Sequence, residues 1–126
     1  MQQQRAAFAL KKVQDVGDDK NVDNGEFRAY ASGLPAMVRM SGLGQAMAFC
    51  LTKGAAYQRL YSILSEWLTK EGQPYHGHQN LMEGITGEDM HRYRAAQAEA
   101  LALLDWIKKF AVAYLRDETA KEARPS

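Results

Sequence analysis

Residues 34–53, LPAMVRMSGLGQAMAFCLTK, constrain the fold more than any other part of the chain, because this most apolar run also contains a proline and two closely spaced glycines. Pro35 removes a backbone donor and crowds the preceding turn, so we expect it to open a helix or to kink one. Gly42 and Gly44 let the backbone turn or approach another backbone closely. Beyond them the apolar residues recur at helical spacing. The segment predicts a broken helical hairpin whose second arm is largely buried.

The apolar spacing elsewhere also predicts helices. The predicted helices cover residues 2–16, Asp23 or Asn24 to about Ser32, residues 55–70, and a last helix to about residue 118. Tyr30, Tyr57, Tyr61 and Trp67 fall on the apolar stripes, so they are expected to belong mostly to the core and not to a base-stacking platform. The fold class predicted is all-α, a compact single-domain bundle of five or six helices over residues 1–126, with a frayed tail at 119–126.

One long connection interrupts this pattern, at residues 71–86, EGQPYHGHQNLMEGIT. We expect a loop there, held to the core by Leu81, Met82 and Ile85, since loops of this length are often functional. Thr86, followed three residues later by Asp89, matches a capping box and predicts the start of the last helix.

Composition is ordinary for a soluble globular protein, with 46% hydrophobic and 25% charged residues. No apolar run reaches the roughly 20 residues of a membrane span, and the N-terminal MQQQRAAFALKK is amphipathic, so neither membrane contact nor a signal peptide is expected. The single cysteine rules out an internal disulfide and suits a reducing compartment. These features predict a cytoplasmic protein.

Charge is segregated along the chain, although the formal net charge is only +1. No Asp or Glu lies between Glu26 and Glu66, and the first twelve residues also lack acids. We expect the cations of these segments to gather on one exposed surface and to contact a phosphate backbone. The predicted binding residues are Lys12, Arg28, Arg39, Gln45, Lys53 and Arg59.

Plainer interpretations exist for the polar residues. Each arginine is as readily an ordinary surface residue, and the Gln45 amide is equally able to satisfy a carbonyl freed at Pro35. Lysines three or four residues from an acid on a helix are expected to form solvated ion pairs. Such pairs are predicted for Asp105 with Lys108 and Lys109, and for Glu66 with Lys70.

Few residues suggest chemistry. His76 and His78, with His91 and Glu83, offer metal-ligand types, but nothing at i+4 supplies a further ligand, so a solvated or partner-facing loop is favoured over a metal site. Cys50 lies among apolar residues and is interpreted as a small hydrophobe. No phosphate-binding loop, dinucleotide fingerprint or serine elbow is present. The sequence predicts neither an enzyme nor a cofactor nor a metal; a histidine-based hydrolase is the weakest hypothesis.

Several short motifs together resemble the small helical subunit of type III-B CRISPR effector complexes, also called the RAMP module. The matching residues are Leu34-Pro35-Ala36, Gly42-Leu43-Gly44-Gln45-Ala46, Ala48-Phe49, Tyr57, Leu60-Tyr61 and Trp67-Leu68. The resemblance covers roughly residues 1 to 70, and the later helix only in kind. Its shared motif is chiefly structural, so the predicted binding residues rest on charge placement.

The resemblance implies a role without an active site. Copies of such subunits stack side by side within a ribonucleoprotein, along the guide RNA/target RNA duplex, and cleavage belongs to other subunits. The implied partners are the RNA backbone, other CRISPR effector subunits and further copies of the chain. The alternative is a structural adaptor that holds neighbouring proteins and never touches RNA.

Overall fold

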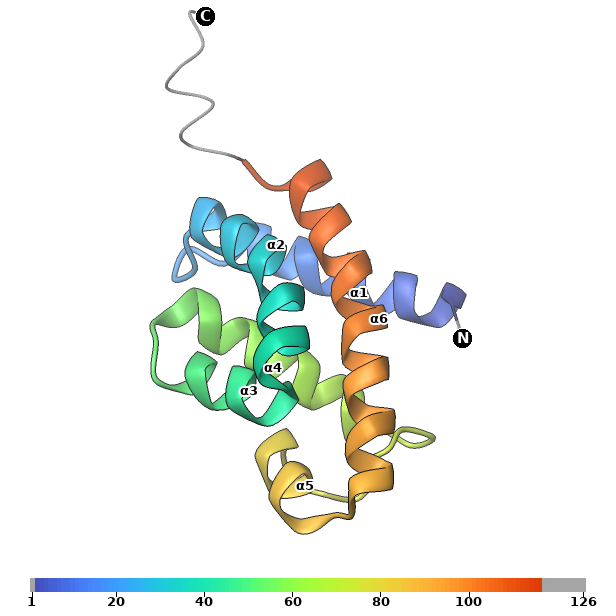
Figure 1. Cartoon of the computed structure of the whole chain (residues 1–126). Coiled ribbons are helices and arrows are strands. Elements are labelled where there is room, and N and C mark those ends of the chain that lie inside the picture. Colours follow the sequence, from blue (N-terminus) through green and yellow to red (C-terminus); the bar gives the residue numbers. More distant parts are fainter. Residues whose placement is uncertain (1, 117–126) are drawn as a thin grey trace, which may run out of the picture.

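The structure, a computed structural model, describes residues 2–116 (Figure 1). Within that range the chain forms six helices and no strand, which confirms the all-α prediction. They are α1 (Gln2–Gly17), α2 (Asn24–Ser41), α3 (Leu43–Leu51), α4 (Ala55–Leu68), α5 (Leu81–Gly87) and α6 (Met90–Tyr114). The predicted frayed tail, 119–126, lies outside the described residues.

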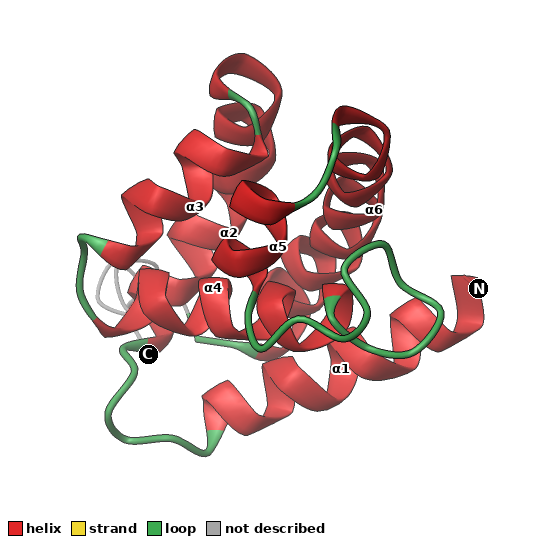
Figure 2. Ribbon diagram, turned by 90° about the horizontal axis from the view of Figure 1, so that it is seen from below, coloured by secondary structure: helices red, strands yellow, loops and turns green. Residues whose placement is uncertain are grey.

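The helix α6 is the longest element, and α1 and α2 pack against two different sides of it (Figure 1). α3 and α4 pack against α2, and the short α5 closes one end of the bundle against α3 and α4 (Figure 2). All the layers contribute to one apolar core, which includes Tyr61 and Trp67, with Tyr30 and Tyr57 packed against its edge. The expected core position of these aromatics is therefore correct.

The break in the predicted hairpin lies at Gly42 and not at Pro35. α2 passes through Pro35 to Ser41, so the predicted end at Ser32 is wrong. The apolar spacing of α2 continues in register through the proline, whose ring is itself buried, and this packing offsets a cost of about 3 kcal/mol for an interior proline. Gly42 then takes φ 86°, a conformation that favours glycine, and α3 follows at once.

The second arm of the hairpin is buried, as predicted. α3 begins directly after Gly42 and buries Leu43, Ala46, Met47 and Cys50. A Cβ at Gly44 would lie 3.4 Å from Ile85 and 3.5 Å from the Tyr93 hydroxyl. The two glycines therefore bring this corner close to α5 and α6.

The predicted loop over residues 71–86 is wrong in its second half, which is helix α5. Asn80 begins this helix, because its side chain accepts a hydrogen bond from the Glu83 amide at 2.9 Å. Leu81 is buried, and Met82 and Ile85 pack against the core, as expected. A helix of seven residues has little intrinsic stability, so its apolar contacts with the bundle decide its formation.

The last helix begins where predicted, but with a different cap. Asp89 is the N-cap residue of α6 and accepts a hydrogen bond from the Arg92 amide at 2.9 Å. Thr86 belongs to α5, and its hydroxyl donates to the Met82 carbonyl at 2.9 Å. Among the helices described, none has both the length and the apolar character needed to cross a membrane.

Candidate nucleic-acid interface

The seam between α2 and α6, called the α2–α6 seam below, runs along the outside of the bundle. At one end, the amide of Leu43 donates to Oε1 of Gln97 at 2.9 Å, just after α2 ends. At the other end, a surface cavity of about 230 Å³ is lined by residues of both helices, including Arg28, Ser32 and Val112. The two helices therefore lie side by side and antiparallel along most of α2.

Two of the predicted binding residues, Arg28 and Arg39, share the flank of α2 that faces α6. They are eleven residues apart, which is close to three helical turns, and Ser32 lies between them on the same flank. Arg28 lines the cavity at the seam, and Arg39 is exposed one turn before α2 ends. Since α2 contains no acidic residue after Glu26, no carboxylate of α2 itself lies on this flank beyond its first turn.

Gln45 and Lys53 lie on the exposed side of α3 and just after it. Lys53 Nζ lies 5.0 Å from the Phe49 ring centroid, a cation–π contact that leaves the ammonium accessible. The Gln45 side chain makes no hydrogen bond within residues 2–116, so its amide does not satisfy a carbonyl of α2. At the start of this helix, the Gly44 amide donates to the Tyr93 hydroxyl at 2.8 Å and the Leu43 amide donates to Gln97, so neither amide is available to a phosphate.

Lys12 and Arg59 are paired with carboxylates from other elements. Lys12 Nζ lies 2.7 Å from Oε1 of Glu66, beside a cleft between α1 and α4. Arg59 of α4 forms an ion pair with Asp19, in the connection after α1. The six predicted residues are thus not gathered on one surface, because acids 54 and 40 residues away in the sequence reach two of them. RNA contact by each of the six stays a prediction.

Of the three predicted helical ion pairs, only the one between Asp105 and Lys109 is found within residues 2–116. Lys109 Nζ lies 3.1 Å from Asp105, as expected. Lys70 instead lies over two aromatic rings, 4.6 Å from the Phe8 centroid and 5.6 Å from the Trp67 centroid, while Glu66 is taken by Lys12. Burial of those rings beside the lysine explains the difference, since a cation–π contact competes well with an exposed ion pair.

The histidine loop is organised by carboxylates. Nδ1 of His78 lies 3.0 Å from Oε1 of Glu83, and Nε2 lies 2.7 Å from Oε2 of Glu88. These hydrogen bonds, the one to Glu88 first, raise the pKa of His78, because they stabilise its doubly protonated ring. Residues 2–116 contain no group of three or more His, Cys, Asp or Glu placed to hold a metal ion.

The only cysteine of the chain, Cys50, is fully buried in the core. Burial raises the pKa of its thiol to about 11, because an apolar environment disfavours the thiolate. At neutral pH the thiolate population is therefore very small, which does not suit a nucleophile.

Comparison with known proteins identifies the family. The family model described as CRISPR-associated protein (Cas_Cmr5) matches residues 1–114. The chain belongs to this family. A curated relative, the CRISPR system Cmr subunit Cmr5 of Thermus thermophilus, is 32% identical over 113 residues, covering 89% of this chain and 93% of the relative. The crystal structure of a CRISPR-associated Cmr5 family protein from the same organism has a TM-score of 0.77 and 29% identity, covering 92% of this chain and 98% of that one.

The Cas_Cmr5 match extends further than the sequence motifs did. The motifs covered roughly residues 1 to 70, whereas the family match includes α5 and all of α6. The suspected relationship to a small CRISPR Cmr subunit is therefore confirmed, and it covers the whole bundle. That later part includes Gln97 and Tyr93, whose side-chain oxygens accept hydrogen bonds from the amides of Leu43 and Gly44 at the turn between α2 and α3.

Sequence reasoning missed two exposed cations of α6, Arg94 and Lys108. Lys108 was assigned to an ion pair with Asp105, and Arg94 lies in an alanine-rich stretch that shows no motif. Both are exposed, and neither forms an ion pair within residues 2–116. Their spacing of fourteen residues, four helical turns, was the available signal that they share one side of α6.

Proposed function

We propose that this chain is a non-catalytic small subunit of a cytoplasmic CRISPR Cmr ribonucleoprotein that contacts the phosphate backbone of RNA. One observation carries the RNA part: Arg39 and Lys53 are exposed and have no carboxylate partner within residues 2–116, in the acid-free part of the chain. Family membership supports the assembly, since the curated relative is named a CRISPR system Cmr subunit.

A subunit that contacts backbone and not bases needs cations on a rigid support and no specificity pocket. The α2–α3 hairpin suits this role, because its inner residues belong to the core while Arg39, Gln45 and Lys53 face solvent. In the proposed assembly, copies lie side by side along the guide RNA/target RNA duplex, next to other effector subunits. Charge segregation within a near-neutral chain favours such head-to-tail contacts between copies.

The state of the two candidate chemical groups supports a role without catalysis. The Cys50 thiol is buried and held protonated, and both ring nitrogens of His78 are bound by carboxylates of the same chain. In the proposed complex, cleavage belongs to other subunits.

A second candidate, a protein adaptor without RNA contact, is favoured by the exposed apolar side chains. Met40 is 87% exposed, Met90 61% and Tyr114 62%. Exposed methionines and tyrosines are common at protein interfaces, and the internal pairing of Lys12 and Arg59 reduces the charge available to RNA. Both roles are compatible with a Cmr subunit.

The charge-reversal variant Arg39→Glu/Lys53→Glu separates the two candidates. If about four phosphates are neutralised per copy, log affinity for single-stranded RNA should fall against log salt with a slope near −3, and the variant should flatten this slope by about 1.4. The control Lys11→Glu/Lys70→Glu makes the same charge change beside the α1–α4 cleft. We expect it to bind like wild type in a fluorescence anisotropy titration.

Unchanged RNA binding by Arg39→Glu/Lys53→Glu, together with loss of co-purification with other subunits, would favour the adaptor. Salt-independent binding by the wild-type protein would contradict the RNA proposal. Circular dichroism melting of each variant shows whether the fold is retained.

A further inference from the structure

The α2–α6 seam has a definite register. The Leu43 amide bonds to Gln97 at one end, and Arg28 and Val112 line one cavity at the other. Residues 28–43 and residues 97–112 span the same number of positions, so the two helices advance by the same rise between these contacts. Each residue of α2 can therefore be matched to the residue of α6 at the same height along the seam.

This register places the exposed cations of both helices in alternation. Lys108 of α6 lies level with Ser32 of α2, and Arg39 of α2 lies level with Leu101 of α6. Arg94 follows beyond the end of α2. With a rise of 1.5 Å per residue, the steps from Lys108 to Arg39 and from Arg39 to Arg94 are each about 10 Å along the seam.

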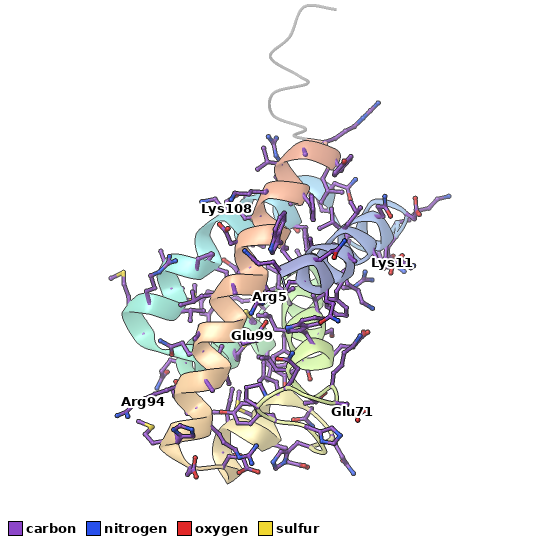
Figure 3. All side chains as sticks on the ribbon, turned by 90° about the vertical axis from the view of Figure 1, so that its right-hand side faces the viewer. Arg5, Lys11, Glu71, Arg94, Glu99 and Lys108 are labelled. Carbon is purple, nitrogen blue, oxygen red and sulfur yellow. The ribbon has the colours of Figure 1, made fainter. Side chains whose placement is uncertain are left out.

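Helical spacing also shows which side of α6 carries Arg94 and Lys108. Arg94, Leu101, Lys108 and Val112 are spaced by seven, seven and four residues, so they form one stripe. Val112 fixes the stripe on the side of α2, because it shares a cavity with residues of that helix. Figure 3 shows Arg94 and Lys108 leaving α6 on this side, whereas Arg5 and Lys11 lie on the side of α1.

We propose that Arg39, Arg94 and Lys108 form a cationic row along the α2–α6 seam that holds one RNA strand by phosphates about three nucleotides apart. This rests on the proposed function and adds α6 to the surface that sequence reasoning confined to the N-terminal half. Within a duplex, each strand carries a charge about every 3.4 Å of helix rise, so cations about 10 Å apart match phosphates about three nucleotides apart.

The surroundings of the row favour a polyanion. Asp105 lies on the same stripe, three residues before Lys108, and its carboxylate is bound by Nζ of Lys109 at 3.1 Å. Ala36 of α2, between the levels of Lys108 and Arg39, is small and exposed, so a strand can approach the helix. Three cations at regular spacing match a phosphate chain better than the irregular surface of a protein.

The test compares three variants by fluorescence anisotropy with one fluorescein-labelled single-stranded RNA over a salt series. Arg94→Glu/Lys108→Glu is expected to weaken binding about tenfold at 50 mM salt and to flatten the log–log slope by about 1.4, since two contacts are lost. Arg39→Glu/Lys53→Glu tests the proposed function separately. Lys11→Glu/Lys70→Glu is the matched control for charge, on the other side of the bundle, and is expected to bind like wild type.

The results for the three variants distinguish the cationic row from the proposed function. Weak binding by Arg94→Glu/Lys108→Glu, with a normal control, supports the row. Normal binding by this variant, with weak binding by Arg39→Glu/Lys53→Glu, overturns the row and leaves the proposed function standing. Normal binding by both overturns both proposals. If Arg94→Glu/Lys108→Glu binds RNA normally but no longer co-purifies with other subunits, the seam is a protein interface. Melting curves and the milder Arg94→Gln/Lys108→Gln guard against misfolding, and the milder variant should also bind more weakly.

Discussion

A single carboxylate, Glu99, connects three helices of the bundle. From α6 it accepts hydrogen bonds from the Arg5 guanidinium of α1 at 2.5 and 2.9 Å, and from the Trp67 indole of α4 at 2.8 Å. Figure 3 shows Arg5 next to Glu99. Burial disfavours its ionised form, but the hydrogen bonds from Arg5 and Trp67 outweigh burial and hold the pKa of Glu99 below its usual value. The Glu99 side chain is only 11% exposed, so solvent cannot replace these bonds.

We expect Glu99→Gln to lower the free energy of unfolding by about 2 kcal/mol at pH 7. Because the folded-state pKa is lowered, the stability from Glu99 is present above the unfolded pKa, about 4.3, and is lost as pH falls through the folded value. The difference between wild type and variant should therefore shrink below about pH 4. Urea unfolding followed by circular dichroism measures it. Asp105→Asn, which removes an exposed pair, should change stability by less than about 0.5 kcal/mol, and an equal effect of both variants would contradict the prediction.

Gly84 is required by its contact with Tyr75. A Cβ at this position would lie 2.4 Å from Cγ and 2.8 Å from Cβ of the tyrosine, which is fully buried. We expect Gly84→Ala to destabilise the protein by about 2 kcal/mol, since the ring has no room to move. A Cβ added at Gly33 of α2 would meet no atom within 4 Å, so Gly33→Ala should stabilise by up to about 1 kcal/mol. Thermal melts that rank the two variants in the opposite order would refute this interpretation.

At the scale of elements, His78 joins the connection after α4 to both α5 and the start of α6. Its partners are Glu83 in α5 and Glu88 just before α6. The hydrogen bonds that raise the pKa of His78 make this clamp dependent on pH. Because the folded pKa lies above the unfolded one, the stability from His78 is complete below about pH 6.5 and is lost as pH rises through the folded value.

The lower edge of this pH window belongs to Glu83. The hydrogen bond from His78 lowers the pKa of Glu83, so its contribution is present above its unfolded pKa and is lost as pH falls through the folded value. The clamp therefore contributes most in mildly acidic solution, between the unfolded pKa of Glu83, about 4.3, and that of His78, about 6.5.

We expect Glu88→Gln to lower the pKa of His78, because it removes the stronger of the two hydrogen-bond acceptors for the charged ring. An NMR titration of the His78 ring protons measures the shift directly. Glu71→Gln removes an exposed carboxylate outside the clamp and serves as the control. Identical His78 titration curves in wild type and Glu88→Gln would rule out the clamp.

For the whole molecule, Cys50 reports on the integrity of the core. The thiol is fully buried on α3, inside the cluster to which every helix contributes, and its pKa is raised to about 11. A thiol reagent can therefore reach it only after the bundle opens.

We expect labelling of Cys50 by a disulfide reagent at pH 8 to be at least about a thousandfold slower in the folded protein than in urea. In a urea series, the labelling transition should coincide with loss of the circular dichroism signal, since both follow the same opening. Rapid labelling without denaturant would show that α3 opens independently of the bundle.

The sequence alone determined the fold class and most of the helices. Apolar spacing is a local property, so α1, α4 and α6 follow from it, as does the buried arm α3. The family motifs likewise lie within one stretch of chain. The turn at Gly42 and Gly44 was also predictable from the sequence. The break was wrongly placed at Pro35, because interior prolines usually end a helix, whereas here burial of the proline ring offsets that cost.

Only the tertiary structure decided which charges are available. Lys12 and Arg59 find carboxylates 54 and 40 residues away, and no local pattern encodes such pairs. The same holds for α5, whose seven residues are helical because the bundle offers them apolar contacts. The α2–α6 seam joins residues up to 84 positions apart, so the alignment of Arg39 with Arg94 and Lys108 depends on antiparallel packing of two helices, which spacing within either helix does not specify.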